Sequence, residues 1–518
     1  MKSNLYKFTA TLSLLAGVSA LAQEKGMGDY TVKPRFAQSG VAPMVMLAMS
    51  KDHQLYYKAY TDFDDLNQNG RLDKSETTYD HGFNYVGYFE PTLCYSYSAE
   101  EADAGGAFII SGFADDDKYC SGSWSGNFLN WATMTRIDVL RKVLFGGLRS
   151  RDNATQTTIL ERSYLPNDAH SFAKFYNGDD LGSLTPYTSS TGITLCNTTL
   201  HNGGDENRLS RTNNNPPLMR VIRGDYSFWA AGERIQCAVA GSAELPPGDN
   251  PPDIGEAVPE VQAQQVTNLL TSYGFTSVPA FKAPANSVVD FTVRVEACEP
   301  SVAASINGCK VYGNNYKPEG VLQRFSTNDE IHWGLLTGSY DKNKTAGVLR
   351  KNIGGISDEI NSETGVIDTS MTNGLINQIN AMRIAGWRWS SNNDNTSYNS
   401  DGCKWSEAQF NEGSCVDWGN PFGELLAESY RYFANGSATS FANGQDEAKA
   451  PADMSVAIWE NVLTADNSCA PLNVLGINAS ASTFDKDGNY AIAGNLDIGS
   501  LTGQAVTKLF NNASTQGE

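Results

Sequence analysis

Short runs of apolar residues at strand-like lengths recur at widely separated points of this sequence. The first, Met44–Ala48, is continuously apolar between Pro43 and Ser50, which is typical of a strand buried in the centre of a parallel sheet. Similar runs and one alternating stretch predict further strands or short packed elements at Pro217–Ile222, Tyr226–Trp229, Val288–Val295, His332–Thr337 and Pro471–Ile477.

Helical periodicity appears between these runs. Across residues 127–145, Trp131 and Ile137 belong to an apolar stripe at helical spacing, and Gly146 and Gly147 would end the helix. We expect this helix to lie on a sheet, and the polar residues 150–215 to leave the core. Further helices are predicted at Leu55–Tyr60, Thr372–Ala385 and Phe422–Phe433. Strands separated by amphipathic helices predict an α/β layered domain that carries polar insertions.

A polar stretch of twelve residues, D-L-N-Q-N-G-R-L-D-K-S-E, runs from Asp65 to Glu76. It has oxygen-bearing side chains at positions 1, 3, 5, 9 and 12 and Gly70 at position 6, which is the calcium-loop pattern of an EF-hand. Leu72 is expected to anchor the loop inward. An Asn/Gly surface turn would have a similar composition. The aromatic, Gly-broken segment after the loop is not helical, so a full helix-loop-helix is not expected. The predicted calcium ligands are Asp65, Asn67, Asn69, Arg71 (through its carbonyl), Asp73 and Glu76.

The first 22 residues have the features of a secretory signal peptide. Lys2 and Lys7 precede an apolar run from Phe8 to Val18, and cleavage is expected after Ala22. That run is too short to span a bilayer, and nothing later approaches twenty consecutive apolar residues, so no transmembrane segment is expected. The mature protein is therefore predicted to be exported, or held at a surface by partners.

The charge balance excludes some partners. The chain has 518 residues and a formal net charge of −20, with 58 acidic against 38 basic residues. Nucleic acid and anionic membranes require basic patches, so neither is an expected partner. An excess of carboxylates agrees with an exterior rich in calcium.

Nine cysteines in an exported chain indicate disulfides. Their order suggests local pairs, although spacing alone does not prove connectivity. Cys469 is left over, and it is free, paired between chains, or separated from a partner beyond residue 518. The candidate pairs are Cys94 with Cys120, Cys196 with Cys237, Cys298 with Cys309, and Cys403 with Cys415.

No catalytic motif is present. The sequence has no GxSxG elbow, no HExxH and no phosphate-binding loop, and its five histidines lack metal-ligand spacing. A secreted hydrolase with an unrecognised pair of carboxylates is the alternative, because two such groups need only converge in space. The tripeptide Arg223-Gly224-Asp225 matches an integrin-binding string, but strings this short occur by chance.

Several long strings resemble the PilY family, the large proteins associated with the tips of type IV pili. The longest is C-S-G-S-W-S-G-N-F-L-N-W-A-T-M-T-R-I-D-V-L-R-K-V-L-F-G-G, residues 120–147. Strings at 49–57, 85–97, 222–229, 334–354 and 469–485 also resemble the N-terminal half of that family, so the resemblance spans roughly residues 41–490.

The resemblance implies a heavily inserted von Willebrand factor A-like domain over residues 23–518. Its insertions would be 49–126 with the calcium loop, 150–285, which is polar and Pro-rich, and the disulfide loop 390–418. The C-terminal propeller domain of longer relatives is expected to be absent. A-type domains carry a D-x-S-x-S metal site after the first strand, but here Ala48 replaces the leading aspartate and Lys51 adds a positive charge. Ser50 and Asp52 would remain of this degenerate site.

The resemblance also implies a role in pilus biogenesis and tip-associated adhesion, with the exported protein at a pilus tip, on the cell surface or associated with the outer membrane. Expected partners are minor pilins or other tip components, with a host or abiotic surface as the adhesion target. A free secreted adhesin unconnected to pili is the alternative among binding proteins. The expected cofactor is Ca²⁺, and no catalysis is expected.

Overall fold

The structure is a computed structural model that describes residues 40–62, 65, 67–100, 105–166, 170–199, 216–226, 237, 268, 271–272, 288–326, 328–385, 387–388, 397–398, 411–438 and 445–485. The predicted signal peptide, the Pro-rich residues 241–259 and Cys403 lie outside the described residues.

Three of the predicted strands, at Met44–Ala48, His332–Thr337 and Pro471–Ile477, lie side by side in one sheet. β1 (Met44–Met49) is flanked by β14 (His332–Gly338) and β18 (Leu472–Ile477) and is parallel to both. β15 (Ala346–Gly354) pairs antiparallel with β14, which gives the order β15-β14-β1-β18. The first apolar run is therefore confirmed as a central strand with parallel neighbours on both sides, but the sheet as a whole is mixed because β15 is antiparallel.

β18 departs from the expectation of a buried strand. It is the last strand of this sheet in the described part of the chain, and Leu472 and Leu475 are 41% and 47% exposed. The apolar run predicted the strand correctly but its burial wrongly, because composition does not distinguish a central strand from an edge strand.

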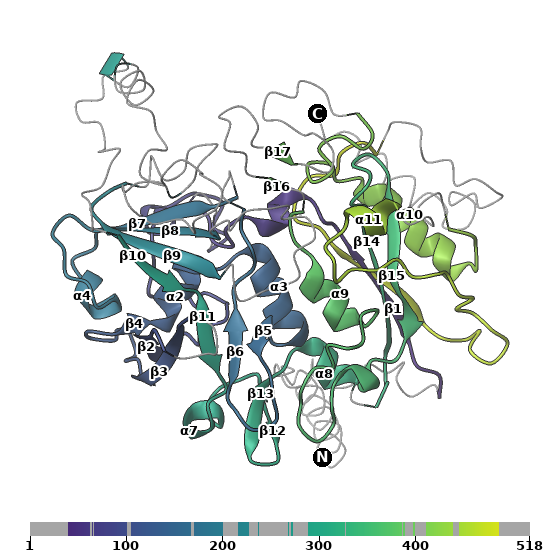
Figure 1. Cartoon of the computed structure of the whole chain (residues 1–518), viewed down its shortest axis with the longest axis horizontal. Helices are drawn as coiled ribbons and strands as arrows, with labels where there is room; N and C mark the ends of the chain where they lie inside the picture. Colours follow the sequence, from purple (N-terminus) through teal and green to yellow (C-terminus); the bar gives the residue numbers. More distant parts are fainter. Residues whose placement is uncertain are drawn as a thin grey trace, which may run out of the picture.

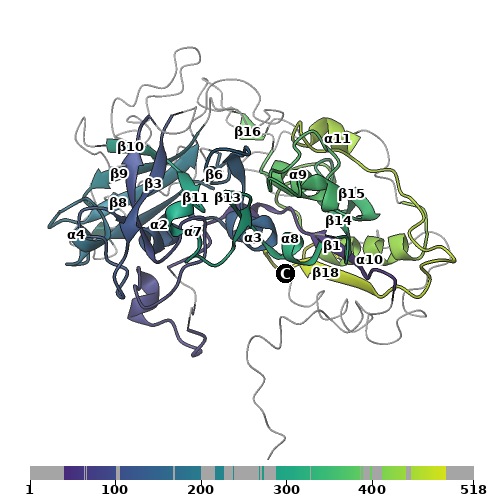
Figure 2. The same ribbon diagram turned by 90° about the horizontal axis from the view of Figure 1, so that it is seen from below.

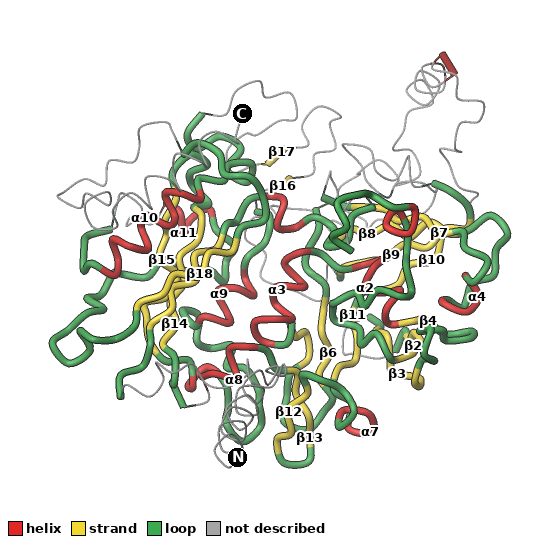
Figure 3. Tube along the Cα trace, turned by 180° about the vertical axis from the view of Figure 1, so that it is seen from behind, coloured by secondary structure: helices red, strands yellow, loops and turns green. Residues whose placement is uncertain are grey.

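Helices cover both faces of this sheet (Figure 1; Figure 3 shows them from behind). Successive strand residues point to opposite faces, so β1 contributes to two cores. Met46 packs with residues of α10 (Phe422–Phe433) on one face. On the other face, Leu47 packs with residues of α3 (Arg136–Phe145) and α9 (Leu375–Ala381). We call β1, β14, β15, β18, α9 and α10 the parallel-sheet lobe.

The rest of the described chain forms mainly antiparallel sheets around a second core. A six-stranded sheet has the order β4-β2-β3-β11-β6-β5, and a four-stranded sheet has the order β10-β9-β8-β7. We call these ten strands and helix α2 the aromatic lobe. Figures 1 and 2 show it on one side of the molecule and the parallel-sheet lobe on the other, with α3 between them. Its strands are β2 (Leu93–Ser98), β3 (Ala107–Phe113), β4 (Trp124–Ser125), β5 (Arg149–Arg151), β6 (Thr158–Glu161), β7 (Phe172–Tyr176), β8 (Ile193–Thr199), β9 (Pro217–Arg223), β10 (Val288–Thr292) and β11 (Arg294–Ala297).

Smaller elements complete the fold. β12 (Cys309–Tyr312) and β13 (Asn315–Pro318) form an antiparallel hairpin, and β16 (Trp387–Arg388) pairs with β17 (Ser397–Tyr398). The short helices are α4 (Leu181–Leu184), α7 (Pro300–Ala303), α8 (Val321–Ser326) and α11 (Gln445–Lys449).

The helix predicted over residues 127–145 is two helices. α2 (Gly126–Thr133) ends at Met134, and α3 begins after Thr135. Thr135 caps α3, because its hydroxyl accepts from the Asp138 N–H while the Asp138 carboxylate accepts from the Thr135 N–H. The predicted end is confirmed, since Gly146 has the left-handed φ of 88° that a helix C-terminus requires.

Three other sequence expectations were wrong. The strand expected over Val288–Val295 is two strands in different sheets, divided at Val293, because the chain crosses from the β9 edge to the β6 edge. The described part of residues 150–215 does not leave the core, since every residue of β8 is buried. The helix expected at Leu55–Tyr60 is a single 3-10 turn, His53–Tyr56.

Disulfides follow the predicted local pairing. The pairs Cys94–Cys120, Cys196–Cys237 and Cys298–Cys309 are present. Cys415 is also disulfide-bonded, and its predicted partner lies outside the described residues. Cys469 is free and exposed. Such bridges are typical of an oxidising, extracytoplasmic compartment.

Arg141 of α3 holds α9 to α3. Its guanidinium is 1% exposed and donates to the carbonyl oxygens of Ile379, Asn380 and Met382 at 2.7–3.3 Å. These carbonyls lie at the C-terminal end of α9, where helices lack intrahelical donors. Helix α3, which lies within the long string at residues 120–147, therefore also caps α9 of the parallel-sheet lobe.

Candidate functional site: the calcium-type loop and the edge of the parallel sheet

Side-chain oxygens of the polar loop accept hydrogen bonds from N–H groups of the same loop. Both carboxylate oxygens of Asp65 accept loop N–H groups, from Asn69 at 3.0 Å and from Gly70 at 2.6 Å. The Asn67 side-chain oxygen accepts from the Asn69 N–H, and that of Asn69 accepts from the Arg71 N–H. Gly70 has a φ of 83°, which a residue with a Cβ rarely adopts.

Glu76, at position 12, closes the loop from its far end. Its carboxylate is 4% exposed and accepts the Asn67 N–H at 2.9 Å and the Asp73 N–H at 2.8 Å. The predicted ligand side chains at positions 1, 3, 5 and 12 thus hold the loop backbone, and Asp73 accepts from the Asn69 amide at 2.6 Å. The two flanking elements, His53–Tyr56 and Lys74–Thr77, are 3-10 turns, in agreement with the expectation that no full helix-loop-helix forms.

Two observations limit the metal-site interpretation. Leu72, expected to anchor the loop inward, is 47% exposed. In the ranges that the structure describes, no three His, Cys, Asp or Glu side chains are grouped as a metal would require. A cation in this loop would therefore depend on the amide oxygens of Asn67 and Asn69 and on the Arg71 carbonyl as well as on carboxylates, which is the mixed oxygen set that Ca²⁺ accepts.

The loop is attached to the aromatic lobe just before its first residue. Asp62 accepts from Lys174 at 2.8 Å, and the Lys174 ammonium is buried and lies 4.7 Å from the centre of the Trp131 ring. Lys58 reaches the same carboxylate at 3.5 Å. Asp62, three positions before Asp65, is thus paired with a buried lysine of β7.

Two asparagines of α2 hold the segment that follows the loop. Asn127 accepts from the Tyr85 N–H and donates to the Phe83 carbonyl and the Tyr79 hydroxyl. Asn130, one turn later, accepts from the Phe89 N–H and donates to the Tyr85 and Phe89 carbonyls at 2.8 and 2.7 Å. Both side chains are fully buried.

The three residues after β1 lie where a parallel sheet presents ligands. Ser50, Lys51 and Asp52 follow the carboxyl end of the central strand, between β14 and β18. Numbered by their order along the chain, the four strands lie across the sheet in the order 3-2-1-4. In doubly wound sheets of that order, ligands bind outside the carboxyl ends of strands 1 and 4. The sheet geometry thus agrees with the position of the degenerate metal site.

A buried ammonium lies at that position. Lys51 is 3% exposed, and its ammonium donates to Asp417 Oδ1 at 2.7 Å and to the Val416 carbonyl at 2.9 Å. The same ammonium lies 4.5 Å from the centre of the Tyr340 ring. A fixed positive charge thus lies beside the residues that would bind the ion.

The remaining groups of the degenerate site serve the backbone. Asp52 Oδ1 accepts from the Gln54 N–H, capping the following turn, and Ser50 Oγ accepts from the Ala479 N–H at 3.4 Å. Burial, with the nearby Asp417 carboxylate, raises the pKa of Tyr340 to about 12, so the phenol stays protonated at neutral pH. Ser50 Oγ and Asp52 Oδ1 thus accept backbone N–H groups, whereas Asp52 Oδ2 is buried without a hydrogen-bond partner among the described residues.

Two family models match parts of the chain. A family model described as "PilY1 homolog, small alpha/beta domain" matches residues 76–222, and one described as "PilY1 homolog, second domain" matches residues 333–517. The chain belongs to the PilY1 homolog family. The first match contains residues 83–89 and α2, and the second contains β15, α10, β18 and all of β14 except His332.

The curated relatives are longer than this chain. A type IV pilus biogenesis factor PilY1 homolog of Xylella fastidiosa (strain Temecula1) is 34% identical over 415 residues, which cover 76% of this chain and 24% of that protein. A second match of the same description and organism is 39% identical over 99 residues, 17% of this chain and 8% of the relative. The matched regions thus span about a quarter or less of these PilY1 homologs. No solved structure matches the chain.

Membership of the PilY1 homolog family agrees with the disulfides in indicating an extracytoplasmic location. Searching the described residues finds no helix long and apolar enough to cross a bilayer. Sequence reasoning missed the partner of Lys51, since Asp417 lies 366 positions away. It also missed the bracing role of Asn127 and Asn130, although two asparagines three residues apart in an apolar helix were a usable signal.

Proposed function

We propose that this PilY1 homolog is a contact protein of type IV pilus biogenesis and tip-associated adhesion that acts without catalysis. The similarity over 76% of the chain to a type IV pilus biogenesis factor is the observation that carries the assembly role. Its partners would be minor pilins or other tip components, and a host or abiotic surface would be the adhesion target.

The parallel-sheet lobe is proposed to be von Willebrand factor A-like. Support comes from the order β15-β14-β1-β18, from helices on both faces, and from the placement of Ser50 and Asp52 at the end of the central strand. In this proposal the Lys51 ammonium stands where such a domain would bind its metal, so adhesion through this lobe would not depend on a divalent cation at that position.

Calcium is proposed to bind the loop between Asp65 and Glu76. The inward-turned oxygens of Asp65, Asn67, Asn69 and Glu76 support this assignment. With three charged ligands, the expected dissociation constant is about 10⁻⁵ to 10⁻³ M, as in extracellular modules. Because the loop connects through Asp62 to Lys174, a bound ion would act as a structural clip on the aromatic lobe.

Asp65→Ala should abolish stabilisation by calcium. Calcium at a hundred times its dissociation constant stabilises a protein by about 2.7 kcal/mol, which should appear as a rise in the thermal midpoint of the wild type after EGTA treatment and readdition of calcium. The matched control is Asp116→Ala, in an exposed acidic run outside the loop. A variant lacking Asp65 that calcium still stabilises as strongly as the wild type would refute the site.

Deletion of the coding region tests the assembly role. We expect a strong reduction of surface pili, twitching motility and attachment, restored by the wild-type chain. Minor pilins should be recovered with the tagged protein, whereas a free adhesin would be recovered without them. Unchanged piliation and motility would contradict the proposal, and turnover of polysaccharide or peptide substrates by the purified chain would favour a hydrolase.

A further inference from the structure

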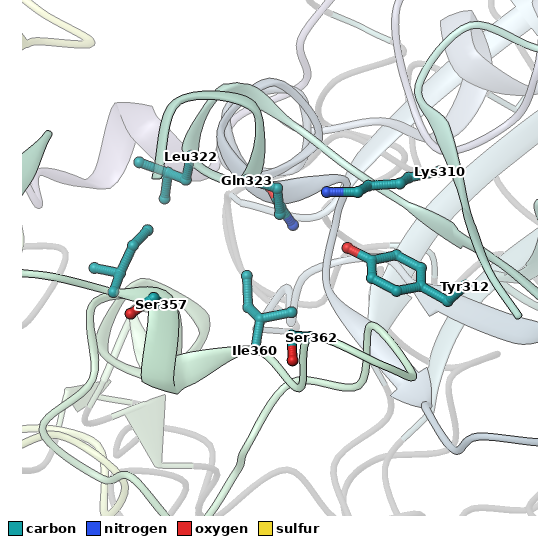
Figure 4. Close-up of a pocket in the computed structure, with 8 residues that line it drawn as sticks. Lys310, Tyr312, Leu322, Gln323, Ser357, Ile360 and Ser362 are labelled. Atoms are coloured by element: carbon teal, nitrogen blue, oxygen red, sulfur yellow. The ribbon is translucent and has the colours of Figure 1, made fainter. Parts of the chain in front are cut away.

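A small pocket lies where the β12–β13 hairpin meets α8 and the segment 356–362 (Figure 4). Its volume is about 50 Å³. Leu322 and Ile356 are buried and, with the partly buried Ile360, provide an apolar floor. Figure 4 shows the Lys310 ammonium and the Tyr312 hydroxyl pointing from the hairpin toward this floor. The pocket therefore places one positive charge beside an apolar recess.

The charge of Lys310 is not used within the described structure. Its ammonium makes no hydrogen bond or ion pair with a described residue and contacts the Tyr312 ring at 5.4 Å. By contrast, the opposite residue in register, Lys317, pairs with Asp152 at 3.0 Å. The nearby Glu359 carboxylate is also committed, because it accepts from the Leu375 and Ile376 N–H groups. In a chain with net charge −20, Lys310 thus stands out as an uncommitted cation.

The hairpin holds these groups in place before any ligand binds. Cys309, adjacent to Lys310, is bonded to Cys298 at the end of β11. Lys310 and Tyr312 are two residues apart on one strand and so share a face. Gly365 allows the Tyr312 ring to approach, because a Cβ at that position would lie 2.5 Å from it. Such preorganisation reduces the entropy lost on binding.

Size and charge together define the ligand. The volume exceeds the 10–15 Å³ or so that one water needs and is well below the roughly 150 Å³ of a cavity that binds benzene. A small aliphatic group fits, and an aromatic ring does not. Neighbouring side chains of an extended peptide point in opposite directions, so an internal residue pair would not place an apolar group and a carboxylate in one small recess. A C-terminal aliphatic residue carries both on a single Cα.

We infer that this pocket binds the C-terminal residue of a partner polypeptide, with a small aliphatic side chain on the Leu322–Ile356–Ile360 floor and the α-carboxylate on the Lys310 ammonium. Tyr312 and Ser362 also line the pocket, and their hydroxyls are further donors. Binding of a C-terminal carboxylate is a known mode of peptide recognition. The inference deepens the proposed contact role and takes its biological meaning from it, but binding is measured on the isolated chain.

The test uses fluorescent peptides and the purified chain in fluorescence polarisation. A peptide ending in valine with a free carboxylate should bind at least tenfold more tightly than the same peptide as its amide, and more tightly than one ending in phenylalanine. Lys310→Met should lose at least tenfold in affinity for the free acid. Arg324→Gln, which removes a 51% exposed cation on neighbouring α8, should leave binding within twofold.

Equal binding of acid and amide would overturn the inference, as would absence of binding by every peptide at millimolar concentration. Equal binding by an amidated peptide with an internal glutamate would show that a side-chain carboxylate suffices, which also overturns it. The acid and amide comparison uses the wild-type chain, so it tests the pocket even if Lys310→Met misfolds. If no peptide binds but deletion of the coding region still removes pili, the pocket assignment is rejected and the assembly role stands.

Discussion

Asp417→Leu is expected to lower the free energy of unfolding by about 3–5 kcal/mol, because it leaves the Lys51 ammonium buried without its carboxylate. Both side chains are 2% exposed, and the ammonium would keep the Val416 carbonyl and the Tyr340 ring as its remaining contacts. Urea denaturation followed by tryptophan fluorescence measures the loss. The loss of stability should be large because the Lys51–Asp417 pair is buried at the carboxyl end of the central strand β1.

Two variants separate the buried pair from its surroundings. Glu319→Gln breaks the pair with the half-exposed Arg324 and should cost less than about 1 kcal/mol. Adding Lys51→Met to Asp417→Leu should recover much of the loss, because replacing both members of a buried pair by apolar residues is often neutral. A loss below about 1 kcal/mol for Asp417→Leu alone would contradict the assignment of Lys51 as a charge that requires this partner.

Asn130→Ala should destabilise the aromatic lobe by about 2–4 kcal/mol. The change leaves the Phe89 N–H and the Tyr85 and Phe89 carbonyls buried without their side-chain partner, and an unsatisfied buried group costs about 1–3 kcal/mol. Asn130→Asp should be at least as harmful, because a carboxylate would face two carbonyl oxygens. Near-ultraviolet circular dichroism at increasing urea concentration reports on the packed aromatic residues.

The control for this prediction is Asn315→Ala. Asn315 donates to the Ala154 and Gln156 carbonyls in an exposed part of the β13 hairpin, so its loss should change stability by less than about 0.5 kcal/mol. If Asn130→Ala were equally mild, the segment 83–89 would hold its conformation without α2, and the bracing role would be wrong.

Local sequence patterns predicted where strands and helices form, whereas pairing between distant segments decided which sheet each strand joins. The run Met44–Ala48 predicted a central parallel strand because a continuous apolar run of strand length is recognisable without knowledge of its neighbours. Residues 288–295 alternate in the same way whether they form one strand or cross between two sheets at Val293. Nothing local distinguishes these cases, because the difference lies in the partners β9 and β6.

The same limit applies to the candidate sites. The spacing of oxygen-bearing residues from Asp65 to Glu76 predicted a set of calcium ligands, and the structure shows that Asp65, Asn67, Asn69 and Glu76 accept N–H groups of the same loop. The spacing did not predict the exposure of Leu72, which depends on what packs beside the loop. The pocket at Lys310 gave no sequence signal, because its floor comes from α8 and residues 356–360, brought together by the fold.

The central strand also sets an order of events during export. Met44 lies beside Asn473, 429 positions further along the chain, so β1 cannot gain its second neighbour until almost all of the described sequence has been translocated. Contacts of such separation form slowly because a long loop must close first. The aromatic lobe, whose strands all lie between residues 93 and 297, can meanwhile fold and form its disulfides. A secretion stall after residue 300 would therefore leave a folded, oxidised lobe attached to a bare β1, an open template for pairing with other chains.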